Sequence, residues 1–209
     1  VWREILAKDP AFRPALEGLA RLAAERERWA EAADWYGQLV ALAPEDPALQ
    51  REYLDMLEAA ERLDEAATVL TRLLERQPED RELLARAATL ARWRDRPADA
   101  VTYDLQRYTL GQLDREGTVQ LIQDLMGLNR HEEALALVKT MAPDRDPEAL
   151  ALLQQVIADL PDPRRQAQEY EALAQLRPDD VDLRLAYAEA LEAAERLPEA
   201  IAEYRVVVA

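Results

Sequence analysis

The chain has 209 residues, of which 49% are hydrophobic and 33% charged, with a formal net charge of −16. This composition indicates a chain that buries a core, and abundant Ala and Leu with a single Phe favour helices over strands. The acidic balance argues against nucleic acid and favours a cationic partner. Cysteine is absent, which excludes disulfides and thiolate metal sites, and no apolar run is long enough for membrane insertion.

A 34-residue period organises the sequence. An acid followed by alanine recurs at Ala32, Ala66, Ala100 and Ala134, which lie 34 residues apart. The apolar residues around these positions have the spacing of amphipathic helices, and charged turns separate them. The pattern therefore predicts a series of αα-hairpins.

Residues 1–12 are predicted to end one repeat, and six repeats are expected to follow. These span 13–46, 47–80, 81–114, 115–146, 147–180 and 181–209. An aspartate stands just before each later first helix, where its carboxylate can accept hydrogen bonds from free backbone N–H groups: Asp46, Asp80, Asp114, Asp146 and Asp180. The final helix has no polar capping helix after it, so we expect a fragment of a longer array.

The third repeat departs from the pattern in its second helix. Asp104 and Arg107 stand at positions that are apolar in the preceding repeats. A shift of one residue would turn Leu105 and Tyr108 inward instead. The sequence therefore predicts a slipped or bent helix, with a bend or a partner site within residues 103–127.

The repeats resemble the tetratricopeptide repeat, a 34-residue helix-turn-helix with small and apolar residues at fixed offsets and a proline near its end. The first full repeat matches at Leu16, Leu19, Ala20, Ala32, Tyr36, Leu39 and Pro44. The family's tryptophan in the first helix is replaced throughout, by Leu16, Gln50, Leu84, Thr118, Leu150 and Arg184. The resemblance covers essentially the whole chain. It implies an all-α solenoid, a right-handed superhelix whose first helices line a concave groove that binds peptides or proteins.

The first-helix faces that would line this groove supply most of the candidate partner-binding residues. They are Glu17, Arg21, Arg51, Asp55, Glu58, Glu82, Arg92, Trp93, Gln123, Glu189 and Glu192. Acids outnumber bases on these faces, so one interpretation is an acidic groove that steers a basic ligand. The alternative is an ordinary solvated helix face.

One locally basic and aromatic patch joins this set through Arg92, Trp93 and Arg96. Trp and Arg are frequent in binding hot spots. The alternative is that Trp93 packs against a neighbouring repeat while the arginines pair with acids. The single histidine, His131, has no partner residues for a metal or catalytic site, so we predict no enzyme activity, no cofactor and no metal.

The predicted function is a non-catalytic scaffold that binds another protein. The alternatives are a cytosolic adaptor and the substrate-binding arm of a larger enzyme. The acidic, Arg- and Ala-rich repeats also resemble the periplasmic repeat scaffold of bacterial exopolysaccharide exporters of the outer membrane, the Pel system in particular. That resemblance implies a periplasmic location, docking of a polysaccharide-modifying deacetylase and contact with a cationic polysaccharide.

Overall fold

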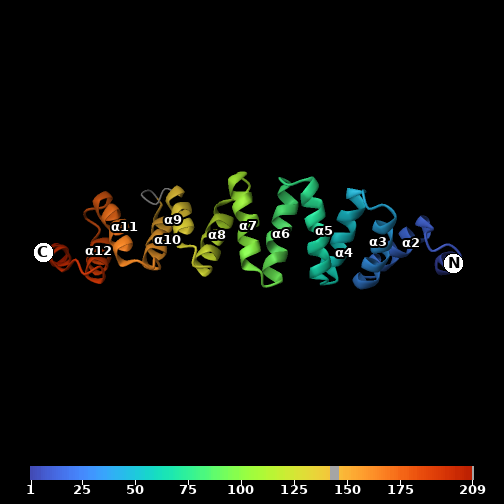
Figure 1. Ribbon diagram of the computed structural model, residues 1–209, viewed down its shortest axis with the longest axis horizontal. Coiled ribbons are helices and arrows are strands. Elements are labelled where there is room, and N and C mark those ends of the chain that lie inside the picture. Colours follow the sequence, from blue (N-terminus) through green and yellow to red (C-terminus); the bar gives the residue numbers. More distant parts are fainter. Residues whose placement is uncertain (142–145, 209) are drawn as a thin grey trace. The chain divides into compact units, whose positions relative to one another are not determined.

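The computed structural model describes residues 1–141 and 146–208, and every regular element in them is an α-helix (Figure 1). The chain divides into two compact units, Val1–Leu113 and Asp114–Ala209. Their boundary lies within one residue of a predicted repeat junction, inside the region 103–127. Each unit is described by itself.

The first unit holds a short N-terminal helix and three hairpins that follow one another along the chain (Figure 1). Its helices are α1 (Trp2–Leu6), α2 (Arg13–Glu25), α3 (Trp29–Leu42), α4 (Pro47–Ala59), α5 (Leu63–Arg76), α6 (Arg81–Trp93) and α7 (Pro97–Thr109). Starts of successive first helices differ by 34 residues, as do starts of successive second helices.

The second unit also consists of three hairpins. Its helices are α8 (Arg115–Gly127), α9 (His131–Thr140), α10 (Pro147–Ala158), α11 (Pro163–Leu176), α12 (Val181–Ala193) and α13 (Leu197–Val207). The predicted end of the fourth repeat includes residues 142–145, which lie outside the described part of the chain.

Aspartate caps start five of the six first helices, as predicted. Asp46, Asp80, Asp114, Asp146 and Asp180 each accept one or two hydrogen bonds from backbone N–H groups in the first helical turn. A carboxylate there satisfies donors that the helix leaves unpaired and interacts favourably with the helix dipole. The helix α2 has Phe12 at this position and no side-chain cap.

After five of the first helices, one residue adopts the left-handed backbone conformation. These residues have positive φ although none is glycine: Glu27, Glu61, Asp95, Asn129 and Glu195. Two hydrogen bonds close each turn; after α4, for example, Glu61 N donates to Glu58 O at 3.0 Å and Arg62 N to Leu57 O at 2.9 Å. This is the Schellman arrangement, and it sets the sharp reversal into each second helix.

The core of the first unit lies between the hairpins. Leu54 and Leu57 on α4 pack in one cluster with Leu70 and Leu73 on α5 and Leu83 on α6. A neighbouring cluster joins α2, α3 and α4 through Leu16, Leu39 and Leu49. Each hairpin therefore covers the apolar side of the next, which is how repeat arrays build a continuous core.

The predicted shift of register in α7 is wrong. Asp104 itself faces inward with 2% of its surface exposed, whereas Leu105 and Tyr108 are half-buried. Its carboxylate accepts hydrogen bonds from Arg92 on α6 and from Arg107, the latter at 2.7 Å. The helix keeps the register because two guanidinium groups compensate the buried charge.

Candidate partner-binding surface

Each first helix leaves one stripe of side chains exposed. On α6 this stripe runs through exposed Glu82, Thr89 and Trp93 and half-buried Arg86, which are spaced by four, three and four residues and so share one face. The opposite side of α6 is buried in the core. This stripe is therefore the part of α6 that a partner can contact over the length of the helix.

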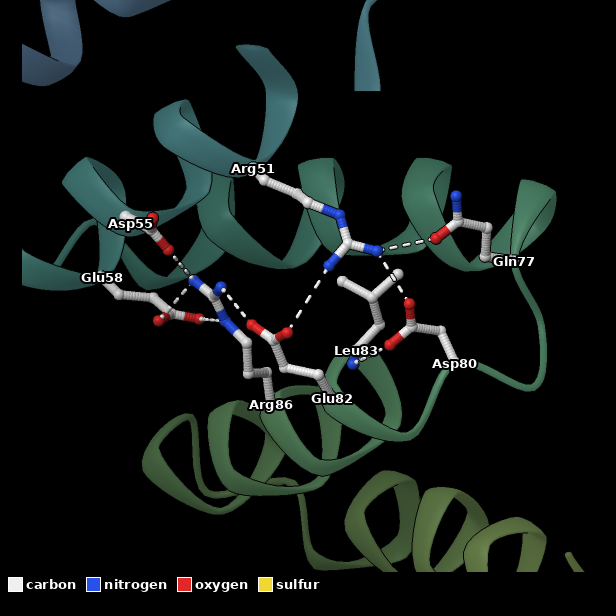
Figure 2. A network of polar contacts seen from close by, with 8 residues as sticks. All are labelled: Arg51, Asp55, Glu58, Gln77, Asp80, Glu82, Leu83 and Arg86. Atoms are coloured by element: carbon white, nitrogen blue, oxygen red, sulfur yellow. Dashed lines mark hydrogen bonds and ion pairs between the residues drawn. The ribbon is translucent and has the colours of Figure 1, made fainter. Parts of the chain in front are cut away.

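Arg86 joins the exposed stripes of α4 and α6. Its guanidinium donates to Glu58 at 2.8 Å and to Asp55 at 2.7 Å, and it lies 3.6 Å from Glu82 on its own helix. Figure 2 shows the Arg86 side chain directed at all three carboxylates. Three of the predicted acidic residues thus share one arginine that the sequence interpretation did not include.

Arg51 makes the second crossing between the two helices. It donates at 2.7 Å to Asp80, the cap of α6, and at 2.7 Å to Gln77, and it lies 3.7 Å from Glu82. Glu82 therefore stands between Arg51 and Arg86 in one connected network (Figure 2). The four carboxylates of this network share two arginines, so it keeps a net charge of −2 (−4 + 2), and its acids are paired across the two helices.

The cap carboxylate of Asp80 shows the electrostatic effect of this network. Hydrogen bonds from the Leu83 N–H and from Arg51 favour its charged form, and they lower its pKa below the ordinary value despite partial burial. Asp146 in the second unit repeats the arrangement, because hydrogen bonds from Arg115 and from the N–H groups of α10 lower its pKa. Arginine of one repeat thus stabilises the cap of the next.

The predicted Arg92, Trp93 and Arg96 patch is divided by the fold. Arg92 pairs with buried Asp104, and Arg96 at the start of α7 lies 3.8 Å from Asp99. Trp93, by contrast, is 60% exposed. The alternative interpretation is therefore confirmed for the arginines, which pair with acids, and wrong for Trp93, whose indole is left on the surface of α6.

Glu17 and Arg21 do come together, in a pocket of about 140 Å³ bounded by α2, α3 and α4. Glu17 accepts a hydrogen bond from Arg13 at 2.7 Å. Tyr36 also lines the pocket, and its pKa is raised first by burial and then by Glu52. Here too the carboxylates face bases of the same chain.

The second unit holds the remaining candidates. Gln123 is exposed on α8, and Glu192 on α12 accepts a hydrogen bond from the Tyr204 hydroxyl at 3.0 Å. Glu189 is exposed on α12 and lines a pocket with residues of α10 and α11. Neither glutamate forms an ion pair within the described part of the chain.

The two units differ in charge. Residues 114–209 contain 20 acids and ten bases, a net charge of −10, whereas residues 1–113 contain 22 acids and 16 bases, a net charge of −6. The position of Arg86 is occupied in the second unit by Gln120, Leu152 and Ala186. The second unit therefore has the larger excess of acids over bases.

Arg86 was missed because its role depends on the packing of adjacent repeats. It follows Asp55 by 31 residues and Glu58 by 28, which is close to one repeat, so a search for opposite charges near this separation would have found it. Arg51 and Asp80, 29 residues apart, carry the same signal.

Comparison with known proteins identifies the repeat. Tetratricopeptide repeat models match residues 47–90 in one case and residues 1–47 and 162–209 in another. Together they cover well over half of the chain. The chain belongs to the tetratricopeptide repeat (TPR) family.

Solved structures agree on the TPR fold. A chain of the Naa15/Naa10 assembly bound to HypK-THB matches with a TM-score of 0.67 and 20% identity over 99% of this chain, which spans 33% of that chain's length. A tetratricopeptide repeat protein from Parabacteroides merdae matches with a TM-score of 0.51 and 13% identity, covering 99% of this chain and 78% of that one. No curated protein matches in sequence. The likeness is that of an all-α TPR solenoid.

Two replacements of the family tryptophan have a common structural role. Gln50 and Arg184 each donate a side-chain hydrogen bond to the carbonyl of a proline six residues earlier, Pro44 and Pro178. Both tie the start of a first helix to the preceding TPR.

No described helix is long and apolar enough to cross a membrane.

Proposed function

We propose that this TPR chain is a non-catalytic scaffold that binds a partner protein through the exposed stripes of its first helices. The observation that carries this proposal is the exposure of Trp93, at 60%, on the same stripe as Glu82 and Arg86. A tryptophan offers a large rigid contact area, and such residues are enriched among binding hot spots.

The exposure of Trp93 is not a general feature of its position. The equivalent residues of the other repeats are Glu25, Ala59, Gly127, Asp159 and Ala193, which are small or polar. Helix packing therefore does not require an aromatic side chain at this point of the repeat. A contact with another molecule is a direct reason for an indole there.

The fold supports the same use. The described part of the chain buries its apolar side chains between hairpins and presents the first-helix stripes outward. One solved structure with this fold, the Naa15/Naa10 assembly, is bound to HypK-THB. We therefore propose that this chain also uses its TPR fold to bind a protein partner.

The test is capture of a partner from a lysate of the source organism, followed by affinity measurement with the purified partner. Trp93→Ala is expected to weaken that affinity by about tenfold or more, because truncated hot-spot residues cost ~2 kcal/mol. The matched control is Trp29→Ala at the start of α3, with circular dichroism to confirm that both variants fold. Unchanged affinity of the Trp93 variant would reject this stripe as the binding surface.

A narrower candidate is a periplasmic scaffold in exopolysaccharide export, with a polysaccharide-modifying deacetylase as partner. The acidic balance, and the net charge of −10 in residues 114–209, favours contact with a partly cationic polymer. Its rivals are a cytosolic adaptor and the binding arm of a larger enzyme. A deacetylase recovered in the same capture experiment supports export, and a cytosolic partner contradicts it.

A further inference from the structure

One interior position of the first helices holds a large side chain in every repeat except the third. It is occupied in the other five repeats by Leu19, Tyr53, Leu121, Leu153 and Tyr187. Four of these side chains are at most 8% exposed, and Tyr53 is half-buried. The third repeat has Ala87 there, which is 2% exposed. The helix α6 therefore lacks the side chain that fills this interior position elsewhere.

Tyr53 shows how a large side chain fills the position in the preceding repeat. Its ring lies against Gly37 on α3, where an added Cβ atom would be 3.2 Å from the Tyr53 hydroxyl oxygen. Burial raises the pKa of Tyr53, and the negative charge of Glu65 on α5 raises it further, so this carboxylate lies near the phenol. The ring thus occupies the space between α3, α4 and α5.

The equivalent space in the third repeat is a pocket of about 160 Å³ between α5, α6 and α7. In another protein a cavity of ~150 Å³ binds benzene, so this space is large enough for an aromatic ring. Its lining contains the residues that stand 34 positions after those of the Tyr53 site: Ala87 for Tyr53, Thr71 for Gly37 and Asp99 for Glu65. The surroundings of the ring are therefore repeated, and the ring itself is missing.

Neighbouring side chains do not take the place of the missing ring. Arg94 and Tyr103 line the pocket where the preceding repeat has the smaller Ala60 and Val69, yet about 160 Å³ stays open beside them. The Nε atom of Arg94 donates to the carboxylate of Asp64 on α5 at 2.9 Å. This bond holds the guanidinium group at the wall of the pocket.

The lining suits a phenol in both its apolar and its polar parts. Leu70, Ala87 and Leu90 are each 2% exposed and offer apolar surface to a ring. Arg94 adds a cation, which the face of an aromatic ring attracts. Asp99 lies 3.8 Å from Arg96, too far for a hydrogen bond, so its carboxylate can accept one from a phenol hydroxyl.

We infer that this pocket binds the side chain of a tyrosine from a partner protein, with its ring against Leu70, Ala87 and Leu90 and its hydroxyl directed at Asp99. The ligand takes the place that Tyr53 of this chain fills one repeat earlier. The inference rests on the proposed function, because it gives the same partner a second contact, on a side of α6 distinct from the stripe of Trp93.

The test uses the whole 209-residue chain with ¹³C-labelled alanine methyl groups. N-acetyl-tyrosine amide is titrated while NMR follows the methyl signals of Ala67, Ala87 and Ala91, which line the pocket and are sensitive to the ring current of a bound phenol. We expect saturable shifts at these methyl groups, and none with N-acetyl-alanine amide. N-acetyl-phenylalanine amide should bind about fivefold more weakly, because it cannot donate to Asp99.

Filling the pocket from within the chain locates the site. Ala87→Tyr restores the residue of the preceding repeat and should abolish binding of the tyrosine probe. Ala87→Leu, which introduces the residue of three other repeats, should do the same with a smaller side chain. Ala98→Leu adds an equal side chain at an exposed position of α7 and should leave binding unchanged, with circular dichroism to confirm that all three variants fold.

A second pair of variants tests the polar contact. Asp99→Ala should leave binding of the phenylalanine probe as it is and reduce the affinity for the tyrosine probe about fivefold, to the same value. Glu75→Ala removes a carboxylate from an exposed position of α5 outside the pocket and should keep the preference for tyrosine.

The outcomes separate this inference from the scaffold proposal. Equal affinities for the tyrosine and phenylalanine probes, or full binding in Ala87→Leu, would overturn the pocket assignment even if a partner is captured through Trp93. Binding of p-cresol without binding of N-acetyl-tyrosine amide would also overturn it, because the ligand would then be a free phenol. Normal binding of the tyrosine probe, together with unchanged partner affinity in Trp93→Ala, would instead reject the stripe and leave the pocket standing.

Discussion

Arg86 on α6 donates to the carboxylate of Glu58 on α4 at 2.8 Å, across the interface of two successive repeats. Both side chains are largely buried, at 18% and 23% exposed, so the pair is less screened by water than a surface ion pair. The contribution of this contact to stability can be measured, because all four tryptophans of the chain lie in the first unit and report its unfolding by fluorescence.

Arg86→Met should destabilise the first unit by about 1–2 kcal/mol, because it leaves Glu58 and Asp55 without their shared cation. Urea unfolding followed by tryptophan fluorescence measures this change. Arg72→Met, at an exposed arginine of α5 with no ion pair in the described residues, should change stability by less than about 0.5 kcal/mol. Equal effects of the two substitutions would contradict the role given to Arg86.

Asp104→Ala should cost about 2 kcal/mol or more, because Arg92 and Arg107 lose the buried carboxylate that they share. The pair Asp104→Leu and Arg107→Leu, which copies Leu70 and Leu73 of the preceding repeat, should recover most of this stability. Denaturant midpoints of the single and double variants provide the measurement. A double variant as unstable as Asp104→Ala would show that the ion pairs cannot be replaced by apolar packing.

Glu61→Gly should stabilise the first unit by about 0.5–1 kcal/mol, since glycine adopts a φ of +55° without steric cost. Thermal unfolding compares it with the wild type. Ala59→Gly, two residues earlier at the last residue of α4, should instead destabilise by about 0.5 kcal/mol. A loss of stability at both positions would mean that the left-handed residue contributes through its side chain.

The contribution of Asp80 to stability should depend on pH in a defined direction. Its folded pKa is lowered, so its charge stabilises the folded state above the unfolded pKa of ~3.9 and stops doing so as the pH falls through the folded value. Asp80→Asn keeps a cap acceptor but removes the charge, and should cost ~1 kcal/mol at pH 7.

Urea unfolding at pH 7, 5 and 3 tests this expectation. The difference between wild type and Asp80→Asn should persist at pH 5 and shrink at pH 3. Glu75→Gln on α5 controls for the general effect of removing a charge. A difference that stays constant over the whole range would exclude a charge-dependent role of Asp80.

Most of the fold could be predicted from sequence because its signals are local and periodic. Asp46 and Asp180 mark helix starts, and the alanines at 34-residue intervals give the register. The register error at Asp104 has a different cause, since it depends on Arg92 from another helix. A single-helix pattern cannot show that a buried charge has partners elsewhere.

The surface was harder to predict than the core. Asp55 and Glu82 were interpreted either as part of an acidic groove or as an ordinary solvated face, and their ion pairs with Arg86 and Arg51 of adjacent repeats were not predicted. Hydrophobicity alone does not show whether Trp93 is exposed on the surface or packed against a neighbouring repeat. Glu189 is found by the pattern, but its pocket appears only when α10, α11 and α12 are placed together.

The carboxylate of Asp80 serves two repeats at once, since it caps α6 and binds Arg51 of the hairpin before it. If the earlier hairpin opens, the next one therefore loses a counter-ion at the point where its first helix begins. The shared carboxylate therefore couples the stability of the two neighbouring hairpins, in addition to the apolar contacts between them. Grafting a single hairpin of this chain into another array would then require transfer of the matching arginine from its predecessor.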